Sequence, residues 1–194
     1  MLDITFNNLS KADGSALLSE NNTIVQAAVF GPVDIAQSKM NHEEAVVEIL
    51  YKPKLSIPIT SPSFDQVREV ENLLRCVFKE IILTQLHPRT SISILVQEIY
   101  NGGSLLSSII NASCCALIDA GVPLKCPITG VAVESEGARS CPIDLVFDND
   151  LNIIALLMRD AIDEENFRKA ITTGQQLATR NFAVIRDRVR QRFA

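Results

Sequence analysis

The segment NGGSLLSSIINASCCALIDAGVPL, residues 101–124, decides the fold that we expect for this chain. Gly102 and Gly103 allow the backbone to turn, and Ser104 is a residue type that caps helices by accepting a hydrogen bond from a free backbone N–H. Small residues then alternate with apolar ones until Gly121, which is a typical helix terminator. We therefore predict a helix that packs at close range against a sheet.

The turn before this helix also predicts an anion site. Backbone N–H groups at a helix N-terminus attract anions, and glycines let a ligand approach them closely. Gly102, Gly103 and Ser104 are therefore a candidate phosphate site. The helix terminus alone stabilises a surface anion by about 0.3–1 kcal/mol, so a strong phosphate site needs an arginine as well.

The same segment resembles the motif DGG-[ST]-R-x-A-x-I-x-x-A-x-x-A-L-x-D-A-G-[IV]-P of the RNase PH family, which contains phosphorolytic 3′→5′ exoribonucleases and exosome ring subunits. The match covers residues 102–123, and the hairpin sequence Asp13-Gly14-Ser15 also resembles the family. Active members place an arginine after the Gly-Gly-Ser/Thr to hold inorganic phosphate. This chain has Leu105 there, and Asn101 replaces the aspartate before the glycines. The resemblance therefore implies a degenerate phosphate site without catalytic residues.

The remaining segments predict the element order β-β-β-β-α-β-α-β-β-β-α, which resembles the RNase PH fold, an α/β two-layer unit of sheets and helices. We expect one domain over residues 1–194. Gly31-Pro32 is expected to end the third strand, residues 58–62 to form a linker, Ser63 to cap the next helix with Gln66, and Gly174 to interrupt the last helix. The expected strands are residues 2–6, 15–18, 23–30, 45–51, 91–99, 128–133, 143–147 and 152–158. The first expected helix begins at Ser63 and is ended by His87-Pro88-Arg89, and two further helices cover 104–121 and 163–194.

Composition limits the classes of function. The 194 residues are 47% hydrophobic, enough for a sizeable core, and the 18 basic and 23 acidic residues give a net charge of −5. A protein that binds nucleic acid by itself is usually basic, so we expect any RNA contact to be local or shared with partners. The apolar runs are too short for a membrane span, and residues 1–10 do not resemble a signal peptide.

Cysteine and histidine usage predicts neither a metal site nor a cofactor. The five cysteines form no C-x-x-C pair, and the chain has only two histidines. Cys114 and Cys115 are expected to be small buried residues of the helix–sheet interface. The odd count favours reduced thiols, as in cytosolic or nuclear proteins.

Three arginines are candidates for RNA contact. Arg89 follows a proline just before the 91–99 strand, as in related ring subunits, although an ion pair with a nearby carboxylate is the alternative. Arg75 and Arg68 are also candidates, although the pattern favours solvated charges on the face of the helix that begins at Ser63. The last helix ends with five arginines, 180, 186, 188, 190 and 192, which form either a solvated basic face or a docking stripe.

The acidic residues predict no catalytic cluster. Active family members carry catalytic aspartates in an acidic stretch after the position of Gly137. That region is shortened here, and we interpret Asp144, Asp148 and Asp150 as turn residues. Asp119 is expected to be a structural residue at a helix end.

Among family members, the sequence most resembles the non-catalytic ring subunits. This resemblance implies that the chain is a catalytically inactive subunit of the eukaryotic RNA exosome core ring, which acts in 3′→5′ RNA processing and degradation. The implied partners are other RNase PH-like ring subunits, cap proteins and RNA, in the nucleus, nucleolus and cytoplasm. The alternative is a homodimeric nuclease or a DNA- or RNA-binding protein that degrades nucleic acid outside the exosome. Net acidic charge and the lack of an acidic cluster for two Mg²⁺ ions count against it.

Overall fold

A computed structural model describes residues 2–38, 40–55, 62–134, 142–158 and 163–194. Its element order is the one that the sequence predicts, with one additional 3₁₀ turn. The elements are β1 (Asp3–Phe6), β2 (Gly14–Glu20), β3 (Thr23–Asp34), β4 (Val46–Lys52), α1 (Pro62–Ile81), η1 (Thr84–Leu86), β5 (Thr90–Tyr100), α2 (Leu105–Asp119), β6 (Ile128–Glu134), β7 (Pro142–Asp148), β8 (Ile153–Leu157) and α3 (Glu164–Phe193). That residues 1–194 form one domain stays a prediction.

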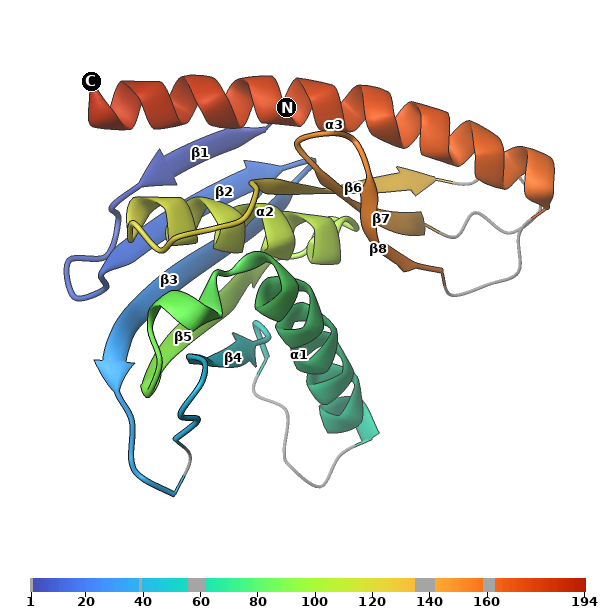
Figure 1. Ribbon diagram of the computed structural model, residues 1–194. Coiled ribbons are helices and arrows are strands. Elements are labelled where there is room, and N and C mark those ends of the chain that lie inside the picture. The colour runs from blue at the N-terminus through green and yellow to red at the C-terminus, as the bar shows by residue number, and fades with distance from the viewer. Residues whose placement is uncertain (1, 39, 56–61, 135–141, 159–162) are drawn as a thin grey trace.

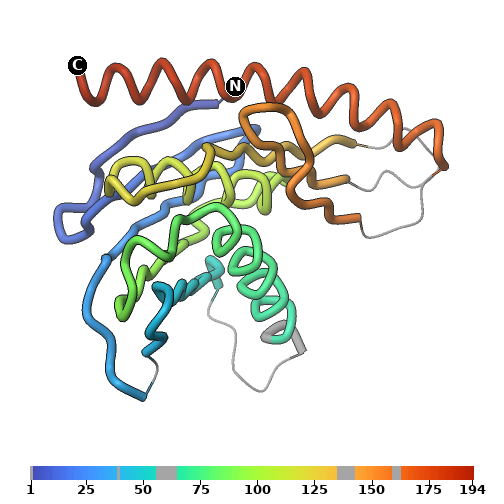
Figure 2. Tube along the Cα trace, in the orientation of Figure 1, coloured from blue at the N-terminus to red at the C-terminus, as the bar shows by residue number. Residues whose placement is uncertain are grey.

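The strands form two sheets on either side of α2. The larger sheet has the order β1-β2-β3-β5-β4, in which only the β4–β5 pair is parallel. The smaller sheet is an antiparallel β6-β7-β8 meander. Figure 1 shows α2 in the middle of the molecule, α1 beside β4, and α3 along the top over β1 and β6. The tube in Figure 2 makes the same layering visible, with β1 directly beneath the C-terminal half of α3.

Helix α2 is buried along almost its whole length because both sheets cover it. Every residue of 107–117 is buried. Small residues allow the close approach, since a Cβ added to Gly14 of β2 would lie 2.5 Å from the Ala116 carbonyl oxygen. On the opposite side, a Cβ on Gly130 of β6 would lie 2.8 Å from Ser107 Cα. The predicted close packing is thus confirmed, and a second sheet encloses the other side.

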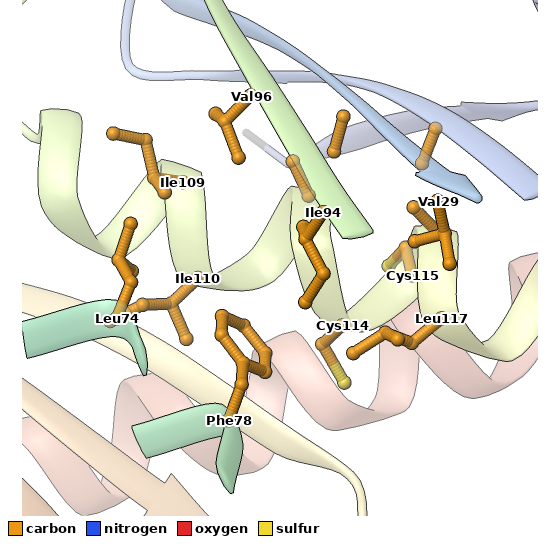
Figure 3. Close-up of a cluster of buried hydrophobic side chains, with 14 of the residues drawn as sticks. Val29, Leu74, Phe78, Ile94, Val96, Ile109, Ile110, Cys114, Cys115 and Leu117 are labelled. Atoms are coloured by element: carbon orange, nitrogen blue, oxygen red, sulfur yellow. The ribbon is translucent and has the colours of Figure 1, made fainter. Parts of the chain in front are cut away.

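The main core lies between α1, α2 and the inner face of the larger sheet. Figure 3 shows Leu74 and Phe78 of α1 pointing toward Ile110 of α2, with Ile94 of β5 opposite. Cys114 and Cys115 are buried in this core, as predicted, and burial raises the pKa of the Cys114 thiol to about 11. A second cluster joins β6 and β7 to the underside of α3.

Two predicted interruptions are wrong. Strand β3 continues through Gly31-Pro32 to Asp34, because a bulge takes these two residues out of the ladder with β5. The Gly31 N–H instead donates to Asp13 Oδ2 at 2.8 Å. Helix α3 is continuous through Gly174, whose missing side chain lets the helix approach Leu145 and Phe147 of β7.

Three other local predictions concern helix ends and loops. Helix α1 already begins at Pro62, a favoured first residue, so Ser63 lies in the first turn and is not the N-cap. The side chain of Ser63 and the linker over 58–61 lie outside the described residues. Spacings of three and four predict one buried stripe on this helix, and the structure confirms it with Phe78 as a further member; its predicted residues are Val67, Val70, Leu74, Val77 and Ile81. The predicted helix end at residues 87–89 is wrong, because α1 ends at Ile81 and a 3₁₀ turn follows.

Candidate functional site at the amino terminus of helix α2

The turn before α2 uses its own backbone N–H groups internally. The Gly102 N–H donates to Thr23 Oγ1 at 3.0 Å, and the Gly103 N–H donates to Asn101 Oδ1 at 3.0 Å. Gly102 packs so closely on the β2–β3 turn that an added Cβ would lie 2.7 Å from the Asn21 carbonyl oxygen. Two donors that an anion would need are therefore already bonded to the protein.

Ser104 occupies the N-cap position but does not cap the helix. Its φ of −104° and ψ of 49° differ from the extended backbone typical of a capping residue, and its side chain makes no capping hydrogen bond. The Ser104 Oγ is buried and has no partner among the described residues. The predicted capping role is therefore wrong. The Ser104 carbonyl oxygen instead accepts from Ser107 Oγ at 3.0 Å and from the Ser108 N–H at 3.1 Å.

The position expected to hold an arginine carries an apolar side chain. Leu105 and its neighbour Leu106 are half-buried and pack against the main core. Leu106 also lines a groove of about 420 Å³, which lies between α1, α2 and β8. Of the described residues in its lining, only Glu69 is charged, and the others include Val70, Leu73 and Leu157. A carboxylate among apolar side chains repels phosphate, so this groove is chemically unsuited to an anion.

The three candidate RNA-contact arginines lie apart. Arg89 precedes β5, whereas Gly102–Ser104 follow it, so a strand of 11 residues, about 30 Å or more, separates the two. Arg89 therefore cannot supply the missing phosphate ligand at α2. Arg75 of α1 lies beside the outer face of the larger sheet, where its Nη1 donates to Asn72 Oδ1 at 2.7 Å. Arg68 is exposed nearer the N-terminus of α1.

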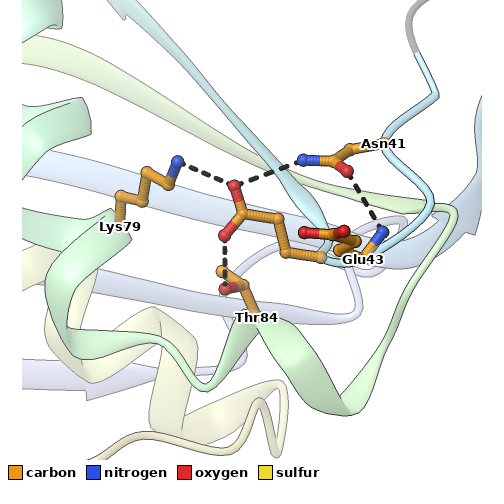
Figure 4. A network of polar contacts seen from close by, with 5 residues as sticks. Asn41, Glu43, Lys79 and Thr84 are labelled. Carbon is orange, nitrogen blue, oxygen red and sulfur yellow. Dashed lines mark hydrogen bonds and ion pairs between the residues drawn. The ribbon is translucent and has the colours of Figure 1, made fainter.

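The surroundings of Arg89 form a structural junction. Arg89 has a left-handed backbone with φ of +64°, and its N–H donates to the Asn41 carbonyl oxygen at 3.1 Å. The carboxylate of Glu44 contacts the side chains of Lys79, Asn41 and Thr84, which Figure 4 labels; the Lys79 Nζ to Glu44 Oε1 distance is 2.8 Å. The hydrogen-bonded Lys79 ammonium lowers the pKa of Glu44. This network fixes the loop before β4 to the end of α1.

The C-terminal arginines are mostly engaged with the protein's own surface. Arg188 Nη2 lies 2.6 Å from Asp3 Oδ1 of β1, and Arg192 Nε lies 3.0 Å from Asp119 Oδ1. Arg186 donates to Asn149 at 3.4 Å, and Arg190 lies 4.0 Å from Asp187. These contacts favour neither a freely solvated face nor a free docking stripe. They fasten α3 across β1 and the end of α2.

Asp119 has the structural role that we predicted, and it also connects three elements of the fold. Its Oδ2 accepts from the Ser15 N–H at 3.0 Å, while its Oδ1 accepts from Arg192. Only 3% of its side chain is exposed. One carboxylate therefore connects the end of α2 to β2 and to the last turn of α3.

The three aspartates of the shortened acidic region do not converge. Asp150 lies in the β7–β8 turn, as predicted, and Asp148 is the last residue of β7, whose carboxylate accepts from the Asp150 N–H of that turn. Asp144 lies within β7, so the turn assignment is wrong for that residue. Four residues of strand separate Asp144 from Asp148, about 13 Å, whereas two-metal sites hold their ions about 4 Å apart. Burial alone would raise the pKa of Asp148, but hydrogen bonds from Asn152 and the Asp150 N–H outweigh it and lower the pKa.

One polar residue that matters here, Asn111, has no role in the sequence analysis. Asn111, fully buried in α2, accepts through Oδ1 from Thr129 Oγ1 and the Gly130 N–H, both at 2.8 Å. Its Nδ2 donates to the Gly130 carbonyl oxygen at 2.9 Å and to Glu20 Oε2 at 3.3 Å. A lone amide inside the apolar run IINASCC was the signal available for it.

The described parts of the chain contain neither a group of side chains suited to a metal ion nor a helix suited to a membrane. No group of three or more His, Cys, Asp or Glu side chains is placed to hold a metal ion. None of the described helices has the length and apolar character needed to cross a membrane.

Comparison with known proteins agrees with this fold. The chain is 40% identical to the exosome complex exonuclease RRP46 homolog of Oryza sativa subsp. japonica over 121 residues, which cover 62% of this chain and 49% of the relative. It is 30% identical to the exosome complex component RRP41 of Bos taurus, over 93% of this chain and 81% of the relative. The chain thus spans about half the length of the RRP46 relatives that it matches.

Solved structures and a family model complete the assignment. The crystal structure of rice RRP46 superposes with a TM-score of 0.86 and 29% identity, over 98% of this chain and 94% of the other. An archaeal exosome core chain gives 0.75 at 16% identity, over 96% and 86%, which supports the fold alone. Residues 1–123 match the model of the 3′ exoribonuclease family, domain 1. The fold predicted from the sequence is confirmed, and the chain belongs to the RNase PH family.

Proposed function

We propose that this chain is a non-catalytic subunit of an RNase PH-type exosome ring, which takes part in 3′→5′ RNA processing and degradation through its partners. The observation that carries the proposal is the α2 terminus. Leu105 stands in the arginine position, and the Gly102 and Gly103 N–H groups are bonded to Thr23 and Asn101. Loss of the cation and occupation of the donors both act against phosphate binding.

A bare sheet face supports a role in assembly. Both α1 and α2 pack on one face of the larger sheet, and no described element covers the opposite, outer face. We define the outer face by Leu17, Ile24, Phe30, Leu50, Leu95 and Ile99, which are half-buried or exposed. It contains a hollow of about 460 Å³. An apolar surface of this kind suits association with another RNase PH-like subunit.

We further propose that cap proteins and RNA are partners in such a ring, in the nucleus, including the nucleolus, and in the cytoplasm. The names of the relatives support the ring and exosome assignment. Arg89 is the exposed candidate for RNA contact, at the end of β5 remote from α2. The alternatives of a homodimer and of DNA binding are distinguished by the experiments below.

The catalytic half of the proposal is tested with the purified chain and 5′-labelled RNA or DNA, with and without phosphate and Mg²⁺. We expect no shortening in any condition. Leu105→Arg is the matched variant, because it returns a cation to the α2 terminus while leaving the engaged glycine N–H groups unchanged. Phosphate-dependent 3′ shortening by the unmodified chain would refute inactivity, and phosphate-independent cleavage of DNA or RNA would favour the nuclease alternative.

The assembly half is tested by co-expression with the RNase PH-like ring subunits of the same organism. Leu50→Arg is expected to abolish co-purification without lowering the melting temperature, since 51% of Leu50 is already exposed. Arg180→Leu on α3 is the control surface change and is expected to leave assembly intact. A chain that forms a stable homodimer and binds none of the subunits would contradict the ring assignment.

A further inference from the structure

A small crevice lies on the α3 side of the α2 terminus, distinct from the groove between α1 and β8. Its volume is about 50 Å³. Elements far apart in the sequence contribute to it: Glu20 from β2, Ser104 and Ser107 at the start of α2, the β6 backbone region at 131–132, and Asn181 from α3. The crevice therefore forms only when the C-terminal helix is docked.

Two polar atoms at this crevice make no hydrogen bond of normal length and angle. The Asn181 side-chain nitrogen is buried, since only 7% of the residue is exposed, and its amide acts on the nearby Glu20 carboxylate without forming such a bond. Ser104 Oγ, which does not cap α2, is likewise buried and unpaired. Buried amide and hydroxyl groups in folded proteins almost always have partners, and ordered molecules supply the ones that the chain does not.

The charges around the crevice exclude ionic occupants. Glu20 is the only charged side chain among its described lining residues, so an anion would be repelled. Burial raises the pKa of Glu20, while the Asn111 and Asn181 amides oppose this shift by favouring the charged form. A cation would find one carboxylate but would face the positive end of the α2 dipole and the Asn181 N–H groups. A neutral group that both donates and accepts hydrogen bonds can pair with each of the polar side chains at the crevice.

We propose that this crevice is a binding site for neutral hydroxyl groups, supplied either by ordered water or by a sugar such as ribose. The hydroxyl oxygen accepts from Asn181 Nδ2, and its hydrogen is donated to Glu20 or Ser104 Oγ. About 10–15 Å³ suffices for one water on this measure of volume, so the crevice has room for several waters or for a sugar edge.

The direct test is crystallographic. Crystals of the full chain, frozen without polyols, are expected to show oxygen density within about 3.2 Å of both Asn181 Nδ2 and Ser104 Oγ. Parallel soaks in D-ribose and 2-deoxy-D-ribose separate the two sources: sugar density replacing the waters identifies a sugar site, and unchanged waters assign the site to water alone. An empty crevice would overturn the proposal.

In solution, one substitution is expected to shift the urea midpoint in opposite directions for a hydrated and for a dry crevice. Asn181→Leu keeps the approximate side-chain volume but removes the amide. If a hydroxyl group bridges Asn181, Glu20 and Ser104, the substitution breaks the bridge and lowers the urea midpoint. If the amide is buried unsatisfied, the substitution removes a destabilising group and raises the midpoint, which would also overturn the proposal. Gln176→Leu, at an exposed position of α3, is the control that measures the effect on stability of introducing a leucine into this helix.

Discussion

Asn111 shows how one polar side chain can connect three buried layers. It lies in α2 and forms hydrogen bonds with Thr129 and Gly130 of β6 and with Glu20 of β2. Both its acceptor and its donor groups form hydrogen bonds, so burying the amide leaves neither group without a partner. The two sheets are therefore held to α2 by directional bonds as well as by apolar contact.

We predict that Asn111→Ala destabilises the protein by about 2–3 kcal/mol, because the Gly130 N–H and the Thr129 hydroxyl then lack their buried acceptor. The measurement is equilibrium urea unfolding followed by circular dichroism. Asn72→Ala is the matched control, since Asn72 is an exposed helical asparagine whose side chain contacts only Arg75. A loss below about 1 kcal/mol would mean that water replaces the amide.

Glu20 gives a prediction about pH. Its pKa is raised in the folded protein, chiefly by burial, so folding favours the protonated form. Its contribution to stability is therefore fully present below the unfolded-state pKa, near 4.5, and is lost as the pH rises through the higher folded-state pKa. Glu20→Gln removes this dependence.

The free energy of unfolding of Glu20→Gln, relative to the unmodified chain, should therefore increase between pH 4 and pH 7. Urea midpoints at intervals across that range provide the measurement. A difference that stays constant, or that decreases with pH, would show that Glu20 is ionised as easily in the folded state as in the unfolded one.

At the scale of elements, glycines decide how closely helices and strands approach. Gly130 and Gly174 both lie at helix–sheet contacts, but the atoms they face differ. A Cβ on Gly130 would meet the backbone of Ser107 at 2.8 and 2.9 Å, whereas a Cβ on Gly174 would meet the side-chain ends of Leu145 and Phe147. Backbone cannot move aside as easily as a flexible side chain.

Gly130→Ala is accordingly expected to destabilise the protein by about 1–3 kcal/mol, as overpacking does in other cores. Gly174→Ala is the comparison variant. There the leucine end can shift, and alanine gains roughly 1 kcal/mol of helix propensity, so the net loss should be smaller. Thermal unfolding of both variants tests this order, and equal losses would contradict the distinction between backbone and side-chain contacts.

Helix α3 is fastened at its end by Arg192. We expect Arg192→Ala to cost about 1–3 kcal/mol, because Asp119 then keeps a buried carboxylate with one donor fewer. Arg190→Ala is the control: its partner Asp187 is exposed and 4.0 Å away, so the change should stay within about 0.5 kcal/mol. Urea midpoints that do not separate the two variants would remove Asp119 as the anchor of this helix.

The sequence predicted the order of the elements because each carries its own local signal. Short apolar stretches bounded by turn residues identified the strands, and the apolar stripe of α1 and the small residues of α2 identified those helices. The errors at Gly31-Pro32 and Gly174 arose because tertiary contacts outweighed local preference: a bulge accommodates the proline, and β7 packs against the glycine. The partners of Asn111 and Asp119 could not be predicted, since they lie far along the chain.

For the candidate site, the sequence predicted the loss of the phosphate ligands better than the hydrogen bonds that the turn forms instead. Leu105 and Asn101 marked the altered phosphate site from the motif alone. That Asn101 itself occupies the Gly103 N–H depends on the geometry of the turn. The distance between Arg89 and α2 follows from the full length of β5, which the predicted strand also implied.

At the scale of the whole molecule, the enclosed helix predicts a pattern of hydrogen exchange. Amide protons of α2 between residues 108 and 117 should exchange only through global unfolding, since both sheets cover them. Amides of α1, which packs against β4 with one face exposed, should exchange through smaller openings. Native-state exchange at increasing urea measures both; equal opening free energies in α1 and α2 would contradict this order.

The enclosure of α2 also affects how the fold can be divided. The family match ends at residue 123, just after α2, yet Ile128, Thr129 and Gly130 of β6 contact one side of that helix. A fragment cut at the match boundary would leave its most apolar helix open to water along one side. The match boundary is therefore a boundary of sequence similarity, while the cooperative unit extends across it, and substitutions in α2 must satisfy two sheets at once.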